Sequence, residues 1–220
     1  MKPYYQDEWA TIYHGDCREI LPGLDKVDLV LTDPPYGIGL NTDNSRFSGG
    51  TQGNMAKCGN GVGSAGGKAV IGDDGPFDPS FLLKYFKDGI IWGWNNFPDK
   101  LPAGACLVWL KRYDEAFGSF LSDAETAWMS KGHGVYCRRD LSNNSIANER
   151  VHPTQKPETL MRWCLEFFPK AQTILDPFMG SGTTLRAAKD LNRHAIGIEL
   201  EEKYCEIADN RLSQEVFDFT

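Results

Sequence analysis

The sequence predicts an α/β fold with a single doubly wound, mostly parallel sheet. The first observation is a nearly all-apolar run at 27–32, the pattern of a parallel strand that is buried on both faces. The second is that helices and strands alternate strictly after residue 157, which implies crossover helices between parallel strands. The third is size, because 220 residues with 41% hydrophobic content suffice for one substantial core.

Each element follows from its local pattern. In the first half we expect strands at 11–14, 27–32, 89–92, 105–110 and 135–138, helices at 17–21 and 79–86, and mixed or helical structure at 113–130. In the second half, Pro157 suits the first residue of a helix, and apolar residues then recur at helical spacing as far as Phe168. The remaining elements are strands at 173–175 and 195–198 and helices at 183–191 and 204–212.

The chain has no clear linker and no internal repeat, so we expect one domain over 1–220. A glycine-rich segment at about 41–70 interrupts it, with eight glycines between positions 49 and 67. A loop of this length inside a compact domain is typical of a functional lid or of a disordered segment. We therefore expect a flexible loop and leave both interpretations open.

The bulk composition excludes several classes of protein. No apolar stretch reaches transmembrane length, and the first residues lack the apolar core of a signal peptide, so we expect a cytoplasmic chain without membrane contact. The six cysteines form no CxxC pair and have no histidine at ligand spacing, which argues against a metal site and a disulfide framework. The net charge of −7 argues against tight nucleic-acid binding. However, 131–156 carries five basic and two acidic residues, a solvated surface or a local patch that faces phosphates.

The most informative motif is Asp33-Pro34-Pro35-Tyr36, which directly follows the strand at 27–32. Proline has no backbone donor and fixes φ, so the carboxylate and the nearby carbonyls are left to face a ligand. Tyr36 adds a flat ring against which that ligand can stack. We call this motif the cup, and it suits a planar molecule with an amino group, such as a nucleobase. The alternative is a plain X-Pro turn at the end of a strand.

A second motif, the glycine loop at Asp176–Thr184, lies between a predicted strand and a predicted helix, where open α/β sheets bind ligands. It lacks the ending of a phosphate loop and the spacing of a dinucleotide motif. Glu199 ends the next strand, where an acid can accept both hydroxyls of a ribose. Asp16 ends the first strand, where it can accept from an adenine amino group or cap the following helix. A plain turn, in which Ser181 and Thr183 cap the helix, is the alternative for the loop.

The cup, the segment His-Pro-Thr-Gln-Lys-Pro at 152–157 and the glycine loop occur in this order along the chain. Together they resemble the amino-group DNA methyltransferases that use S-adenosylmethionine, in the circularly permuted beta class of DPPY type. The resemblance extends from about Tyr13 to Leu212. It implies a Rossmann-like methyltransferase sheet in permuted order, and an enzyme of restriction-modification systems that methylates adenine N6 or cytosine N4 in DNA.

The resemblance also implies roles for individual residues. The catalytic residues would be those of the cup, Asp33, Pro34, Pro35 and Tyr36. The cofactor residues would be Asp176, Phe178, Gly180, Ser181, Gly182 and Thr183 for the methionine part, Glu199 for the ribose, Asp16 and Cys17 for the adenine, and Thr154 and Lys156 for the carboxylate.

The chemistry of the cup suits an exocyclic amine, which is a poor nucleophile because its lone pair is delocalised into the ring. Asp33 and the Pro34 carbonyl would each accept one amino hydrogen, so that the nitrogen attacks the methyl group directly and in line. A base in a duplex must first be flipped out to reach such a cup. None of the six cysteines follows a proline, which argues against the covalent route of ring-carbon cytosine methylation.

The target base and the contacts to DNA are less constrained. Asp at the first position of the cup resembles the adenine enzymes more than the cytosine-N4 enzymes, so we expect adenine N6, with cytosine N4 as the alternative. A protein-glutamine or RNA methyltransferase and a non-catalytic DNA-binding module are more distant alternatives. Only part of 111–150 is left for target recognition, so we expect specificity that is short, relaxed or completed by the second subunit of a homodimer. DNA contacts are expected at Arg112, Arg138 and Arg139.

Overall fold

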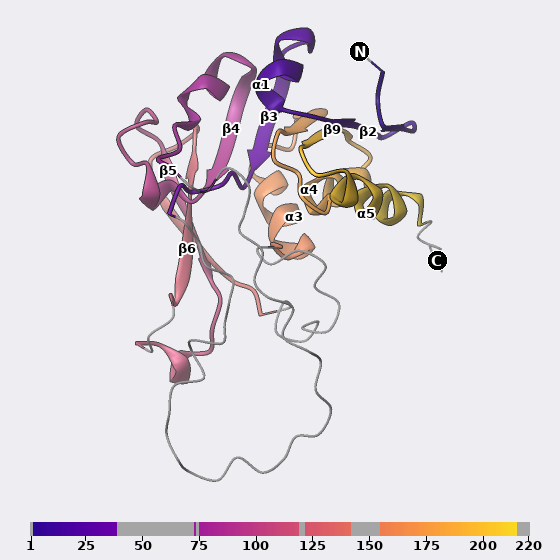
Figure 1. Ribbon diagram of the computed structural model, residues 1–220. Helices are drawn as coiled ribbons and strands as arrows, with labels where there is room; N and C mark the ends of the chain where they lie inside the picture. Colours follow the sequence, from indigo (N-terminus) through magenta and orange to yellow (C-terminus); the bar gives the residue numbers. More distant parts are fainter. Residues whose placement is uncertain (1, 39–72, 74, 119–121, 142–154, 215–220) are drawn as a thin grey trace. The chain divides into compact units, whose positions relative to one another are not determined.

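The computed structural model describes residues 2–38, 73, 75–118, 122–141 and 155–214. These residues include a nine-stranded sheet in the order β1-β2-β9-β8-β3-β4-β6-β5-β7 (Figure 1). The chain divides into two compact units, Met1–Pro34 together with Asp78–Thr220, which contains the sheet, and Pro35–Phe77. The glycine-rich loop predicted at about 41–70 lies outside the described residues, and a single domain over 1–220 stays a prediction.

The strands of the sheet are β1 (Tyr5–Gln6), β2 (Ala10–His14), β3 (Val27–Thr32), β4 (Phe86–Trp92), β5 (Ala105–Leu110), β6 (Ala124–Met129), β7 (Val135–Arg139), β8 (Thr173–Asp176) and β9 (His194–Glu199). The α-helices are α1 (Cys17–Ile20), α3 (Glu158–Glu166), α4 (Thr183–Lys189) and α5 (Glu202–Ser213). Short 3-10 helices are η1 (Leu21–Gly23), η3 (Pro79–Lys84), η4 (Trp94–Asn96) and η5 (Asp114–Ala116). No described helix has both the length and the apolar character needed to cross a membrane.

Most neighbouring strands run parallel, which confirms the predicted fold class. The parallel pairs are β2–β9, β9–β8, β8–β3, β3–β4 and β5–β7, and the antiparallel pairs are β1–β2, β4–β6 and β6–β5. Strand β3 is the central strand of the nine, and its neighbour β8 comes from the other half of the chain. The chain winds outward in both directions from this pair, and open α/β sheets bind their ligands at the carboxyl ends of such a pair.

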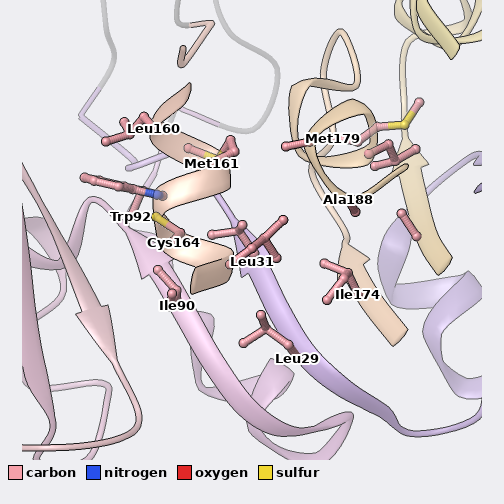
Figure 2. Close-up of a cluster of buried hydrophobic side chains, with 14 of the residues drawn as sticks. Leu29, Leu31, Ile90, Trp92, Leu160, Met161, Cys164, Ile174, Met179 and Ala188 are labelled. Atoms are coloured by element: carbon pink, nitrogen blue, oxygen red, sulfur yellow. The ribbon is translucent and has the colours of Figure 1, made fainter. Parts of the chain in front are cut away.

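The core explains why β3 lies in the middle of the sheet. Leu29, Val30 and Leu31 are all fully buried, as expected for a strand covered on both faces. Helix α3 packs over this region: Figure 2 shows Leu160 and Cys164 of α3 on the side of the sheet that carries Leu31, Ile90 and Trp92. The helix begins directly after Pro157, and its buried residues recur at helical spacing, as predicted.

The segment 113–130, expected to be mixed or helical, is mixed, because it contains the 3-10 helix η5 and the strand β6, whose backbone groups pair with β4 and β5. One expected element was wrong. The helix expected at 79–86 is the shorter 3-10 helix η3, and β4 already begins at Phe86 because its residues pair with β3 from Val27 onward.

Candidate active site

The predicted site residues Asp33 and Asp176 lie at the same edge of the sheet. Asp33 follows β3, Asp176 ends β8, and the parallel register of the two strands pairs Val30 with Leu175. A buried hydrogen bond joins the two strand ends, from the hydroxyl of Thr32 to Oδ1 of Asp176 at 2.7 Å. Asp33 and the glycine loop therefore follow two adjacent strands at the same edge of the sheet.

Asp176 is a buried carboxylate, with a relative exposure of 3%. Its Oδ1 also accepts a hydrogen bond from the backbone N–H of Phe178 at 3.2 Å. Burial raises the pKa of Asp176 to about 6 against these hydrogen bonds, and the nearby charge of Asp33 adds to the increase. A cationic ligand beside Asp176 would therefore favour the ionised form of its carboxylate.

Two glycines of the loop adopt left-handed backbone conformations, Gly180 with φ of 51° and Gly182 with φ of 77°. Gly182 caps α4, and a Cβ there would lie 2.7 Å from the Cβ of Ala208 on α5. Glycine is therefore required at this position by both conformation and space. No side chain caps the start of α4, so the alternative that Ser181 and Thr183 serve as helix caps is not what the described residues show.

The loop hydroxyls instead bind residues from elsewhere in the chain. Ser181 donates to Oε1 of Gln155 at 3.1 Å. Arg211 of α5 donates to Oγ1 of Thr183 at 2.9 Å and to Oγ of Ser181 at 3.4 Å. Sequence reasoning missed Arg211, because an arginine on the polar side of a terminal helix carries no signal of its own.

Glu199 at the end of β9 is fixed by two backbone donors. Its Oε2 accepts from Gly180 at 3.0 Å and its Oε1 from Glu201 at 2.8 Å. Burial raises the pKa of Glu199 against these hydrogen bonds. The carboxylate is thereby tied to the glycine loop that it was expected to accompany.

The structure places Asp16 and Cys17 next to this strand end, because His14 of β2 pairs with Glu199 of β9. Oδ1 of Asp16 accepts from the backbone N–H of Arg18 at 2.8 Å and caps α1. The capping role considered for Asp16 is thus present, and its role toward an adenine stays a prediction. The Cys17 side chain is buried.

Lys156 lies between two acids of the chain itself. Its ammonium nitrogen lies 2.5 Å from Oδ2 of Asp33 and 2.9 Å from Oε2 of Glu125 on β6. The Glu125 contact is an ion pair that lacks hydrogen-bond alignment at Oε2. The role of Lys156 toward a cofactor carboxylate stays a prediction. Glu125 was not among the predicted site residues, because a single acid in a strand of mixed composition carries no signal of its own. Thr154 lies outside the described residues.

The residues after Asp33 and Pro34 belong to the second unit. There, the backbone N–H groups of Gly37 and Ile38 donate to Oδ1 of Asp73 at 2.7 and 3.2 Å. Gly37 has a φ of 71°, and its Cβ position is filled by the carbonyl oxygen of Gly75. Pro35 and Tyr36 therefore lead into a tight turn, and their roles in a cup stay predictions.

The three arginines expected to contact DNA do not form one patch. Arg138 and Arg139 are successive residues of β7 and so point to opposite faces of the sheet. Arg139 forms an ion pair with Asp114, and Arg112 donates to the carbonyl of Ala116 at 3.4 Å, so these two meet at the turn η5. Arg138 lies 3.9 Å from Asp140. Their contacts to DNA stay predictions.

Comparisons with known proteins agree with this geometry. The profile of the N6/N4 DNA methylase family matches residues 81–210, more than half of the chain. The type II methyltransferase M2.LlaDCHI of Lactococcus lactis subsp. cremoris is 25% identical over 268 residues, which cover 97% of this chain and 93% of that protein.

Solved structures show the same fold. The M1.HpyAVI–SAM complex has a TM-score of 0.55 and 22% identity, over 93% of this chain and 100% of that chain. The cytosine-N4-specific PvuII DNA methyltransferase has a TM-score of 0.63 and 16% identity, over 100% of this chain and 91% of that chain. The predicted methyltransferase-type sheet is therefore confirmed. The chain belongs to the N6/N4 family of DNA methylases, and S-adenosylmethionine is its methyl donor.

Proposed function

We propose that this protein methylates the exocyclic N6 of adenine in DNA, on a base that is flipped out of the duplex. The observation that supports this most is Asp33 at the carboxyl end of β3, where a buried lysine neutralises it beside the start of the glycine loop. Aspartate at this position of the cup resembles the adenine enzymes more than the cytosine-N4 enzymes.

The residues around the glycine loop suit S-adenosylmethionine. When bound, this cofactor supplies a methyl group on a positively charged sulfonium. A cation beside Asp176 would stabilise its ionised carboxylate, whose pKa burial raises. Phe178, Gly180, Ser181, Gly182 and Thr183 would hold the methionine part, Glu199 the ribose, and Asp16 and Cys17 the adenine. The expected contacts of Thr154 and Lys156 to the carboxylate remain part of this proposal.

The reacting group is held by acceptors in the chain. Asp33 and the carbonyl of Pro34 would each accept one hydrogen of the amino group, which draws the nitrogen toward sp³ character and frees its lone pair. Tyr36 would stack on the base. Catalysis is then mostly orientation and placed charge, and no covalent enzyme intermediate is needed.

The flipped base must be delivered from DNA at a cost of about a few kcal/mol. Arg112, Arg138 and Arg139 are proposed to contact phosphates. Because the net charge is −7, binding that rests on such local contacts should weaken steeply with salt. A homodimer would provide further recognition surface for the short segment within 111–150.

Cytosine N4 is the alternative target, since the same two acceptors can hold either exocyclic amine. A nucleoside digest separates the two targets. The purified protein is incubated with S-adenosylmethionine and unmethylated DNA of mixed sequence, with a control lacking the cofactor, and methylated nucleosides are quantified by mass spectrometry. We expect N6-methyldeoxyadenosine. N4-methyldeoxycytidine in its place would reassign the base, and the absence of both would favour a non-catalytic DNA-binding module.

A further inference from the structure

A row of side chains crosses the carboxyl edge of the sheet beside Asp33. Trp92 ends β4, the parallel neighbour of β3, and pairs across the next ladder with Ala127 of β6. Glu125 lies two residues before Ala127, so it faces the same side of the sheet, and it pairs directly with Trp109 of β5. Across the adjacent strands β3, β4, β6 and β5, the residues at this edge are therefore Asp33, Trp92, Glu125 and Trp109, in this order.

Lys156, which precedes α3, lies over this row. Its ammonium nitrogen is 2.5 Å from Oδ2 of Asp33 and 2.9 Å from Oε2 of Glu125, and so bridges the two acids. The same nitrogen lies 5.6 Å from the ring centre of Trp92 and 6.0 Å from that of Trp109, within the range of cation–π attraction. The lysine side chain is only 6% exposed, so two carboxylates and two rings take the place of water around its charge.

Glu125 is held from its other side by Lys111, whose ammonium nitrogen lies 2.9 Å from Oε1. Burial opposes the charged form of Glu125, but the charges of Lys156 and Lys111 outweigh burial and hold its pKa well below the usual range. Glu125 is therefore ionised at neutral pH. The charges alternate along the cluster in the order Asp33, Lys156, Glu125, Lys111.

We propose that Lys156 and Glu125 are positioning residues for the acceptor carboxylate of Asp33. Lys156 fixes Oδ2 of Asp33 and keeps the carboxylate ionised, as an acceptor of amino hydrogens must be. Glu125 holds Lys156, a point charge on a flexible stem, and takes up part of that charge. Without Glu125 the full charge of Lys156 would act on Asp33 and weaken it as an acceptor. This inference depends on the proposed role of Asp33 in methyl transfer.

Other titratable groups act on this cluster from neighbouring elements. Asp176 of β8 and Asp33 repel each other's negative charge. Cys164 of α3 lies beside Trp92 (Figure 2), and burial raises the pKa of its thiol, which keeps it neutral. The charge of Arg138 on β7 also acts at Cys164, and Nε of Arg138 lies 3.9 Å from Oδ2 of Asp140. The variants below leave all of these groups unchanged.

The test is the acid limb of the pH profile of kcat. In Lys156→Met, Asp33 loses its cation, so the limb should move up by about one pH unit or more and kcat should fall. In Glu125→Gln the shape of the side chain stays but its charge is lost, so the limb should move down. We expect kcat to fall there by roughly tenfold, with the KM for S-adenosylmethionine near its wild-type value.

Lys111→Met is the matched control. It removes a lysine that binds the same glutamate at the same distance, but at the oxygen that faces away from Lys156. Its acid limb should move up by much less than that of Lys156→Met, because Lys111 lies on the far side of Glu125 from Lys156. Opposite shifts in Lys156→Met and Glu125→Gln would support the inference. An unchanged limb in both, with only lowered melting temperatures, would overturn it. If Lys156→Met does not fold, Glu125→Gln decides alone, since an unchanged or rising limb there contradicts the inference.

A second measurement separates this inference from the proposed function. Carbon-13 NMR of the Asp33 carboxyl, assigned with Asp33→Asn, follows its titration without turnover. The same opposite shifts are expected in the spectra of Lys156→Met and Glu125→Gln. A protein that methylates no DNA would refute the proposed function, while these spectra would still show whether Lys156 and Glu125 control Asp33.

Discussion

The hydroxyl of Thr32 donates a 2.7 Å hydrogen bond to Asp176, and both side chains are almost completely buried, at 1% and 3% exposure. This contact joins the last residue of β3 to the first residue of the glycine loop. The residue that precedes the proposed acceptor Asp33 is therefore tied to the proposed cofactor carboxylate.

Replacing Thr32 with valine should weaken both stability and cofactor binding. The variant keeps the shape of the side chain but leaves a buried carboxylate with one donor fewer, which should lower the free energy of unfolding by roughly 1–3 kcal/mol. Urea denaturation and calorimetric titration with S-adenosylmethionine measure the two effects. Thr126→Val is the control, because its hydroxyl binds Asn95 at an exposed position. Equal results for the two variants would contradict the importance of the contact.

Asp176 should give the cofactor-free protein a specific pH dependence. Its pKa is raised from 3.8 to about 6, so the folded state binds this proton more tightly than the unfolded state does. The contribution to stability is fully present below the ordinary pKa and is lost as the pH rises through about 6. The wild-type free energy of unfolding should therefore fall relative to Asp176→Asn, by on the order of 3 kcal/mol, over this interval. Denaturation curves at several pH values measure this difference, and a constant or rising difference would refute the prediction.

Gly182→Ala should disrupt the glycine loop. Its φ of 77° disfavours any side chain, and the new methyl group would lie 2.7 Å from Ala208. We expect a loss of roughly 1–3 kcal/mol in stability and a weaker affinity for S-adenosylmethionine. Thermal unfolding and calorimetry test this. Gly23→Ala is the matched control, because a Cβ there meets no atom within 4 Å. A Gly182→Ala protein as stable as this control would contradict the packing argument.

The centre of the fold could be predicted from sequence because its signals are local. The apolar run into Asp33 and the strand into Asp176 each identify a parallel strand and its carboxyl end, and parallel strands end at one edge. Pro157 and the residues after it likewise identify α3. In each case a few neighbouring residues contain the whole pattern.

The strand β6 could not be predicted, because its pairing depends on β4 and β5 rather than on its own mixed composition. The contact between Glu125 and Lys156 could not be predicted for a related reason. A lone acid and a lone lysine are normally solvated, and only the packing of α3 over the sheet buries this pair. The same holds for Arg211, which reaches Thr183 from the last helix.

The central claim is that Asp33 accepts a hydrogen of the target amino group during methyl transfer and has no part in binding the cofactor. The most direct experiment measures the transfer of labelled methyl groups to DNA and the Kd of S-adenosylmethionine. It compares the wild-type protein with Asp33→Ala and with a control, Asp25→Ala, which replaces an exposed acid before the same strand. We expect Asp33→Ala to lose transfer while its Kd stays near that of the other two proteins. Wild-type turnover in Asp33→Ala, or a loss of cofactor binding that accounts for its lost activity, would contradict the claim.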